Sequence, residues 1–190
     1  QNDTVQSIVQ RYPGTIVHAV PRQPCAKAGM LPASGHCYTR DAPADGYLRG
    51  EGCGAIVLEA FDESSSKDVY ASFFGTIVMS DGKSASITAP HGLAQERVIQ
   101  QALRVSNIKP DEVDYIEAHG TGTALGDPIE IEALAGVFAS SMNNSSSSSR
   151  SLMVGSVKSN IGHLEMAAGM AGLIKAIGSK SGERSAKCWS

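Results

Sequence analysis

Apolar residues form several short runs of strand length, separated by polar or glycine-rich stretches. Residues 52–59 form a continuous apolar run, and residues 69–79 are rich in β-branched and aromatic side chains. We predict a strand in each, the first one buried on both faces of a sheet. The apolar runs at 113–118 and 152–157 predict two further strands.

Between these runs, apolar residues recur at the spacing of an α-helix. Residues 93–105 place apolar side chains on one face and polar ones on the other. Pro128 suits the first turn of a helix that runs to about Ala139, with Asp127 as its candidate N-cap. Residues 161–177 are apolar and rich in alanine and glycine, which predicts a buried scaffolding helix.

The alternation of strands and helices over 69–177 predicts a βαβ-type layered sheet of the α/β class. Residues 1–27 are poorly patterned and broken by prolines, and the polar stretch around the serine tract 145–149 is predicted to be a flexible inserted loop. The chain begins with Gln1, so we expect it to be a fragment of a longer protein.

Composition excludes several classes of function. The net charge is −3 and lysines and arginines do not cluster, so nucleic acid is not an expected partner. No membrane span is predicted, because the apolar stretch 161–177 contains His163, Glu165 and Lys175 and is too short. The four cysteines lack the C-x-x-C spacing of a zinc site, so we expect no metal and a reducing, cytoplasmic location.

Two glycine-punctuated histidine segments carry the candidate chemistry. His119 opens His-Gly-Thr-Gly-Thr directly after the run 113–118, and His163 closes Asn-Ile-Gly-His after the run 152–157. Two imidazoles held at such turns could donate hydrogen bonds to one developing oxyanion. A helix beginning at His163 would keep that imidazole neutral. The alternative is that each histidine only bonds its own turn.

Other polar residues near these turns have structural interpretations as well. Lys158 is expected to be partly buried and therefore to need a partner, for which Glu165 is the obvious candidate. Asp127 and Glu130 are expected to be structural, since acidic residues favour the first turn of any helix. The glycines after His119 do not match a nucleotide-binding loop, whose spacings are absent here.

Three segments resemble signatures of the β-ketoacyl synthases, the condensing domains of polyketide and fatty acid synthases. They are residues 117–130, residues 154–165 and residues 44–54, the last being most similar to the modular polyketide type. The resemblance extends from about residue 28 to residue 177. It implies the thiolase-like fold, which in a full domain has two duplicated α/β halves packed as α/β/α/β/α layers.

On this resemblance, residues 28–62 are the end of the N-terminal half of the domain. Residues 69–177 are most of the C-terminal half, with a serine-rich loop at 143–151. Residues 1–27 and 178–190 are left unassigned.

The resemblance implies decarboxylative Claisen condensation between an acyl thioester and a malonyl-type thioester. His119 and His163 would be the catalytic residues that stabilise the enolate, with Lys158, Glu165 and Asn160 in the supporting polar network. The family requires no metal or redox cofactor of its own.

The resemblance also implies partners. The substrate arrives on the phosphopantetheine arm of an acyl carrier protein, whose amides Thr121 and Thr123 would bind. The family is usually a homodimer.

The nucleophile of the family is missing from its expected setting. The family cysteine lies in an Asp-Thr-Ala-Cys-Ser-Ser elbow, and Cys25, Cys37, Cys53 and Cys188 all lack that context.

Cys53 lies in an apolar run and is predicted to be an inert core thiol. His91 stands where the family usually has asparagine. The fragment alone is therefore predicted to be inactive.

Two alternatives remain open. The chain could be a non-catalytic partner subunit or a degenerate remnant, which the missing nucleophile favours and the two intact histidines oppose. Thiolase-type cleavage would need a second cysteine as base near the C-terminus, and Cys188 lacks the glycine-rich setting for it.

Overall fold

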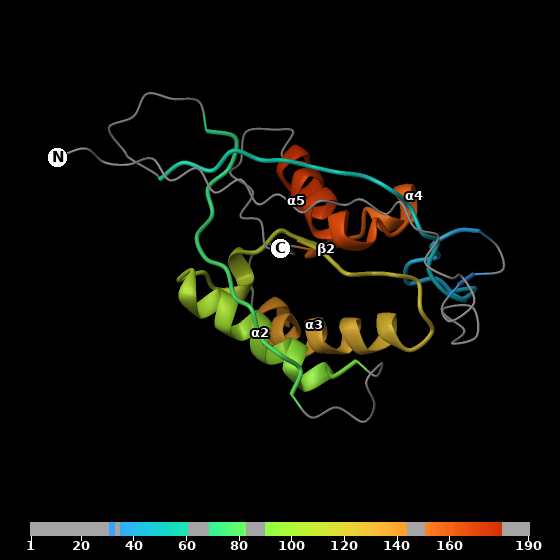
Figure 1. The fold of residues 1–190 in the computed structure, drawn as a ribbon. Helices are drawn as coiled ribbons and strands as arrows, with labels where there is room; N and C mark the ends of the chain where they lie inside the picture. The colour runs from blue at the N-terminus through green and yellow to red at the C-terminus, as the bar shows by residue number, and fades with distance from the viewer. Residues whose placement is uncertain (1–30, 33–34, 61–68, 83–89, 144–150, 180–190) are drawn as a thin grey trace.

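The computed structural model describes residues 31–32, 35–60, 69–82, 90–143 and 151–179 (Figure 1). Along the chain its elements are α2 (Gly92–Val105), η1 (Pro110–Glu112), β1 (Tyr115–Glu117), α3 (Gly126–Asn143), β2 (Met153–Gly155), α4 (Lys158–Ile161), η2 (Glu165–Ala167) and α5 (Ala168–Gly178). The serine tract 145–149, Cys25 and Cys188 lie outside the described residues.

The predicted βαβ unit is present. Strands β1 and β2 pair in parallel, with Ile116 opposite Val154, and α3 makes the crossover between them. The sheet lies between α5 on one face and α2 with α3 on the other (Figure 1). The two apolar runs at 113–118 and 152–157 are therefore correctly predicted as strands, although the paired parts are shorter.

Helix α2 confirms the helix predicted for residues 93–105. His91 is its N-cap, and the ring Nδ1 of His91 accepts a hydrogen bond from the Ala94 amide at 3.1 Å. Arg104 lies in the last turn, where a cation interacts favourably with the helix dipole. His91, which stands where the family usually has asparagine, thus has a local structural role as the N-cap of α2.

The core lies between α2, α3 and the sheet. It is a cluster of five buried side chains, Leu103, Ile108, Val113, Leu134 and Phe138. Ile116 and Val154 from the two strands pack against this cluster. Because β1 alternates, Tyr115 and Glu117 point to the opposite face, toward α5.

Helix α3 begins earlier than predicted, at Gly126, so Asp127 is not its N-cap. The hydroxyl of Thr123 accepts from the Gly126 amide at 3.2 Å at the start of this helix. The buried Asp127 carboxylate instead accepts from the amides of Gly122 (3.1 Å) and Arg40 (2.7 Å). Its role is structural, as predicted, but it joins two loops to the helix.

The helix predicted for residues 161–177 is interrupted. Helix α4 ends at Ile161, its C-cap Gly162 has a φ of 75° that favours glycine, and Glu165 also has a positive φ of 52°. Helix α5 then begins at Ala168 and buries three of its small residues, Ala168, Gly172 and Ala176, whereas Gly169 is exposed. No described helix is long and apolar enough to cross a membrane.

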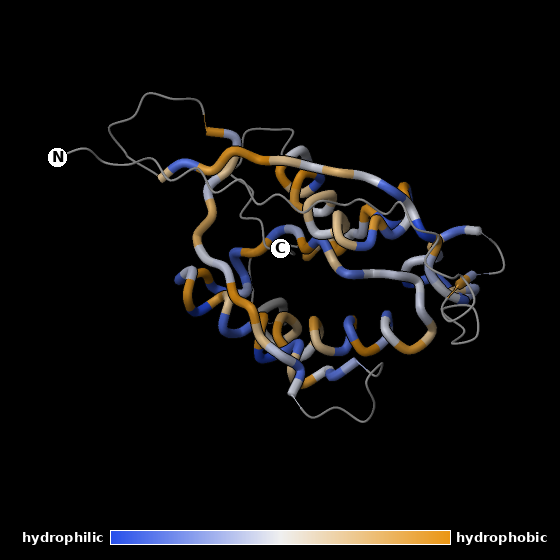
Figure 2. The backbone as a smooth tube through the Cα atoms, viewed as in Figure 1, coloured by the Kyte–Doolittle hydropathy of each residue, from blue (hydrophilic) through white to orange (hydrophobic). Residues whose placement is uncertain are grey.

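The strands predicted for residues 52–59 and 69–79 are wrong for the described structure. Both segments are extended but pair with no described strand. Most of their apolar side chains are open to solvent, with Val57 91% and Val78 98% exposed, although Ile56 and Ile77 are partly buried. Figure 2 shows these hydrophobic stretches running along the outside of the fold. A strand buried on both faces needs neighbours, and the described residues do not supply them.

One side of the first extended segment nevertheless packs closely. A Cβ on Gly50 would lie 2.6 Å from the Ile161 carbonyl oxygen, and one on Gly52 would lie 2.9 Å from Leu164. Glycine at alternate positions therefore lets the backbone approach α4 and the turn after it. Cys53 lies on this segment and is exposed, so its prediction as a core thiol is also wrong.

Candidate functional site

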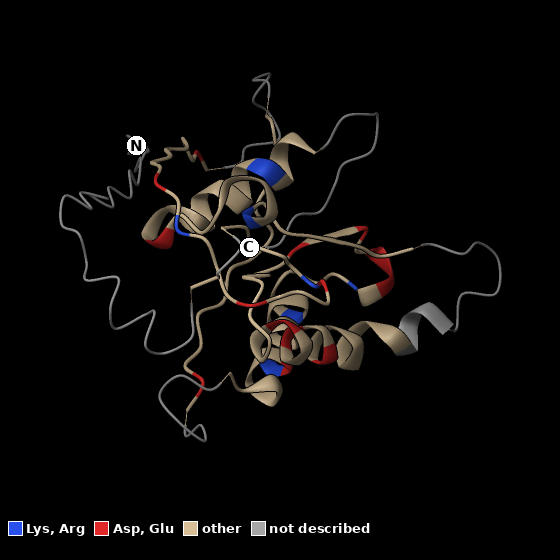
Figure 3. Ribbon diagram, turned by 90° about the vertical axis from the view of Figure 1, so that its right-hand side faces the viewer, with Lys and Arg blue, Asp and Glu red and all other residues tan. Residues whose placement is uncertain are grey.

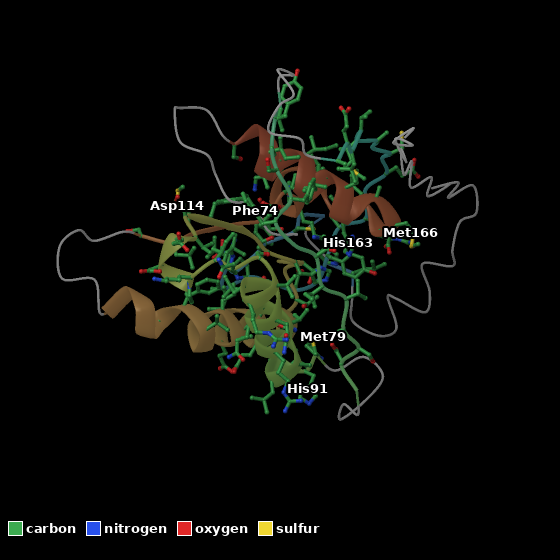
Figure 4. All side chains as sticks on the ribbon, turned by 90° about the vertical axis from the view of Figure 1, so that its left-hand side faces the viewer. Phe74, Met79, His91, Asp114, His163 and Met166 are labelled. Atoms are coloured by element: carbon green, nitrogen blue, oxygen red, sulfur yellow. The ribbon has the colours of Figure 1, made fainter. Side chains whose placement is uncertain are left out.

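The two predicted histidines lie together although they come from different turns. Their ring centroids are 5.6 Å apart and the rings meet edge to face at 86°. His119 follows β1 by two residues, and His163 follows α4. In Figure 4, His163 lies toward the middle of the molecule, between the helices, whereas Met166 and His91 lie near its edges.

The backbone of His163 is fixed from both sides by a neighbouring extended segment. Its amide donates to the Leu48 carbonyl at 2.7 Å, and its carbonyl accepts from the Gly50 amide at 2.9 Å. Arg49, between them, forms a parallel bridge with His163. This segment comes from the third motif noted in the sequence, residues 44–54, so that motif positions the histidine.

A hydrogen bond determines which nitrogen of the His163 ring carries the proton. Nδ1 accepts a hydrogen bond from the Glu165 amide at 2.9 Å, which leaves the proton of the neutral ring on Nε2. Burial, and then the positive charge of Lys158, lower the pKa of His163 from 6.5 to about 4. The ring is therefore neutral at physiological pH and offers an Nε2–H donor. The helix dipole that we predicted as the cause is not required.

The turn that carries His119 is held by a carboxylate from α3. Glu130 accepts from the His119 amide at 2.6 Å with one oxygen and from the Gly120 amide at 2.9 Å with the other. Burial, and then Lys158, also lower the pKa of His119. Both imidazoles thus remain neutral for the same physical reasons.

Gly120 is required where the two turns touch. Its φ is 46°, and a Cβ there would lie 2.6 Å from Thr39 and 2.7 Å from Ser156. The hydroxyl of Thr39 donates to the Gly120 carbonyl at 2.7 Å. The hydroxyl of Ser156 donates to the same carbonyl at 3.2 Å and accepts from the Lys158 amide at 3.3 Å.

Lys158 is buried, with 5% exposed, as predicted, but the expected partner lies elsewhere. Glu165 Oε1 is 2.8 Å from Arg49 Nε, and within the described part of the chain no carboxylate forms an ion pair with the Lys158 ammonium. Burial lowers the pKa of Lys158 while the charges of Glu117 and Glu130 act to raise it. Its positive charge therefore acts on the two imidazoles from within the protein.

The remaining predicted residues divide into two groups. The hydroxyls of Thr121 and Thr123 lie 3.3 Å apart, and both residues line the cavity beside the histidines. Asn160 is exposed and accepts from the Ser159 hydroxyl at 3.3 Å, and it does not line that cavity.

The histidines open into a cavity of about 650 Å³ between the sheet and the helices α2 and α3. Its lining includes the polar residues His119, His163, Thr121 and Thr123, but most of the lining surface is apolar. The apolar wall includes Val98, Ile99, Leu103, Leu134 and Phe138. The site can therefore present two hydrogen-bond donors to a ligand whose remaining surface is apolar.

Sequence reasoning missed two residues of the site. Tyr47 lines the cavity, and its ring centroid is 5.1 Å from that of His163. Glu117 is buried beside the same turns. Both lie within the motifs noted in the sequence, but only the structure shows what they contact.

No metal site is present among the described residues, where no group of three histidine, cysteine, aspartate or glutamate side chains could hold an ion. Lysines and arginines are spread singly over the described part of the molecule (Figure 3).

Comparison with known proteins identifies the fold. The ketosynthase from module 6 of the bacillaene synthase of Bacillus subtilis 168 matches with a TM-score of 0.77 and 37% identity, over 89% of this chain and 29% of that one. The ketosynthase from module 1 of the bacillaene synthase of Bacillus amyloliquefaciens FZB42 matches with a TM-score of 0.71 and 40% identity, over 79% and 27%. The predicted thiolase-like fold is confirmed by these ketosynthases.

Sequence relatives give the same result. One component of the phenolphthiocerol/phthiocerol polyketide synthase of Mycobacterium tuberculosis is 46% identical over 155 residues, which are 80% of this chain and 7% of that protein. Another component of the same synthase is 48% identical over 154 residues, 80% of this chain and 8% of that protein. The chain thus spans less than a tenth of these relatives.

Two family models match. The model "Beta-ketoacyl synthase, N-terminal domain" matches residues 15–64. The model "Beta-ketoacyl synthase, C-terminal domain" matches residues 70–179, more than half of the chain. The chain belongs to the β-ketoacyl synthase family of condensing enzymes, and its relatives are polyketide synthases.

Proposed function

We propose that this chain supplies the decarboxylation half of a β-ketoacyl synthase site in polyketide biosynthesis. The observation that carries the proposal is the convergence of two neutral imidazoles, whose ring centroids are 5.6 Å apart, in the lining of one cavity. His119 and His163 are the catalytic residues. Each would donate an N–H to the thioester oxygen of a malonyl unit, where negative charge develops as carbon dioxide leaves.

The condensation joins two substrates, a malonyl unit and an acyl group held on a cysteine. The bond between the malonyl α-carbon and its carboxylate breaks, carbon dioxide leaves, and the electron pair forms an enolate held by the two histidines. The α-carbon then attacks the carbonyl of an acyl group on the family's cysteine, and that cysteine leaves as a thiolate. The cysteines with described positions, Cys37 and Cys53, lack the sequence context of this nucleophile.

Lys158 favours the neutral form of the two histidines through its positive charge. A protonated histidine would also donate, but it would release its proton to the enolate and end the reaction with an unproductive acetyl unit. Burial lowers the pKa of both His119 and His163, and the charge of Lys158 lowers it further, so both rings are kept neutral. Glu165 positions the ring of His163 through its backbone amide.

The cavity also suits a carrier-bound substrate. Thr121 and Thr123 place two hydroxyls next to the histidines, where they can bond the amides of a phosphopantetheine arm. We propose an acyl carrier protein as the partner that delivers this arm, and a homodimer as the state of the complete domain.

A hybrid domain tests the proposal. This chain replaces the matching segment of the bacillaene module 6 ketosynthase, and release of labelled carbon dioxide from malonyl carrier protein is measured. We expect release that falls by about 10²–10³ in His119→Ala, the effect of one lost oxyanion donor. His36→Ala is the matched control, because His36 is exposed and its ring contacts Tyr38 rather than the site.

Two outcomes are decisive. The chain alone, mixed with acyl and malonyl carrier proteins, is expected to form no β-ketoacyl product, because it lacks the nucleophile. A folded hybrid that accepts an acyl group on its cysteine but releases carbon dioxide equally well with and without His119 would contradict the proposal.

A further inference from the structure

A second buried carboxylate lies next to the histidine turns and has no part in the chemistry above. Glu117 is the last residue of β1, and only 6% of its side chain is exposed. It points toward α5, on the face of the sheet opposite the apolar core. A charged group in such a place requires partners on all sides.

Both oxygens of Glu117 are engaged. Oε2 accepts from Lys175 Nζ at 2.9 Å and from the Tyr115 hydroxyl, and Oε1 accepts from the Val157 amide at 2.5 Å. Burial acts to raise the pKa of Glu117, but the hydrogen bonds from Tyr115, Lys175 and Val157 outweigh it and lower the pKa. The group is therefore a carboxylate.

Two glycines make room for this cluster. A Cβ on Gly172 would lie 3.1 Å from Cγ of Glu117, and a Cβ on Gly155 would lie 3.1 Å from Lys175 Nζ. Larger residues would push the carboxylate or the ammonium out of place. Gly155 of β2 and Gly172 of α5 thus leave space for the Glu117 and Lys175 side chains.

The bond to Val157 links the two halves of the site. Val157 is the N-cap of α4, whose first residue is Lys158 and whose end leads to His163. Glu117 itself lies two positions before His119, with Ala118 between them. One side chain therefore fixes the strand that presents the first histidine and the start of the helical turn that presents the second.

We propose that Glu117 is a positioning residue that sets the distance between the two catalytic imidazoles by anchoring the Val157 amide. The inference deepens the proposed function and rests on it for its catalytic meaning. Lys175 and Tyr115 hold the carboxylate in the orientation that aims Oε1 at Val157. Ser156 also joins the two turns, through hydrogen bonds of its neutral hydroxyl at 3.2–3.3 Å. The bond that Glu117 accepts from Val157 is stronger, because its acceptor is charged.

The geometry is tested on the chain itself by NMR. The pKa of His163 and the nuclear Overhauser effect between the rings of His119 and His163 are measured in Glu117→Ala and Glu117→Gln. We expect Glu117→Ala to lose the contact between the rings and to raise the pKa of His163 by roughly one unit or more, because the ring is less buried. Glu117→Gln removes the same charge but keeps an acceptor for the Val157 amide. We therefore expect this variant to keep the ring contact and to leave the pKa of His163 largely unchanged.

A second variant covers the case in which Glu117→Ala does not fold. Val157→Pro removes the N–H donor and leaves the Glu117 carboxylate in place, and the φ of −63° at Val157 is already that of proline. The same two changes are expected there. Glu112→Gln is the matched control, because the Glu112 carboxylate caps the exposed turn at Lys109, away from the histidines.

An unchanged pKa of His163 and an unchanged ring contact, in Glu117→Ala or in Val157→Pro, would overturn the inference. Glu117 would then only stabilise the fold. The pKa of His163 and the ring contact do not depend on the reaction. A hybrid domain that fails to release carbon dioxide would therefore refute the proposed function without affecting this test of Glu117.

Discussion

Two pairs of apolar segments of similar length behave differently in this molecule. The runs at 113–118 and 152–157 contain paired strands and end in the histidine turns. The runs at 52–59 and 69–79 are extended, exposed and unpaired with any described strand. An apolar run is therefore a strand only where a neighbour satisfies its backbone, and among the described residues only the first pair has such a neighbour.

The same comparison explains why the histidine site is ordered. Its turns are held by carboxylates and hydroxyls of the described part of the chain, such as Glu130, Asp127 and Ser156. The chain spans 29% of the bacillaene module 6 ketosynthase that it matches with a TM-score of 0.77. The contacts that define the site are thus contained within a small part of that domain.

The largest expected effect on stability lies in the core behind the paired strands. Phe138 is 3% exposed and packs in the cluster that supports β1 and β2. Phe138→Ala is expected to lower the free energy of unfolding by about 3–5 kcal/mol, through lost burial and a cavity. Urea denaturation measures this. Ile131→Ala on the same helix, where Ile131 is 37% exposed, is the control and should cost less than about 1 kcal/mol.

Acid should weaken the histidine region next. The pKa of His163 is about 4 in the folded protein against 6.5 ordinarily, so the unfolded chain binds more protons between these values. Stability contributed by neutral His163 is present above pH 6.5 and is lost as the pH falls toward 4. In His163→Gln, denaturation midpoints should fall less over this interval than in the unmodified chain. Equal slopes would show that His163 is not buried as described.

The two described cysteines sharpen the contrast between the regions. Cys53 lies on the unpaired segment and is exposed, whereas Cys37 is buried and burial raises its pKa. Iodoacetamide at neutral pH is expected to label Cys53 roughly ten-fold or more faster than Cys37. Peptide mass spectrometry over time measures both rates. Faster labelling of Cys37 would mean that the segment holding it opens.

The smallest effect is expected on the unpaired segments. Val78 is 98% exposed, so Val78→Ser should change the free energy of unfolding of this chain by no more than about 0.5 kcal/mol. In the hybrid domain, where other strands are present, the same substitution should cost more. Equal small losses in both would mean that the segment remains unpaired there too.

The sequence predicted the features that rest on periodicity or on a recognisable motif. The helix at 93–105, the parallel βαβ unit and the meeting of His119 with His163 are all confirmed. Periodicity and the long motifs were sufficient for these features.

The errors arise where a contact depends on geometry that no pattern contains. Glu165 turns toward Arg49 because Gly162 ends α4 and the backbone of Glu165 adopts a positive φ, which leaves Lys158 without its expected partner. Glu117 could not be recognised, because its meaning depends on an amide 40 residues away at Val157.

The central claim is that His119 and His163 donate to one oxyanion, and a double-mutant cycle in the hybrid domain tests it most directly. Carbon dioxide release is measured for His119→Ala, His163→Ala and the double variant, with acylation of the cysteine measured separately. Each single variant is expected to lose about 10²–10³, and the double variant much less than the product of the two, because residues that act as a unit are not additive. Losses that multiply, or a single variant that releases carbon dioxide at the unmodified rate, would contradict the account.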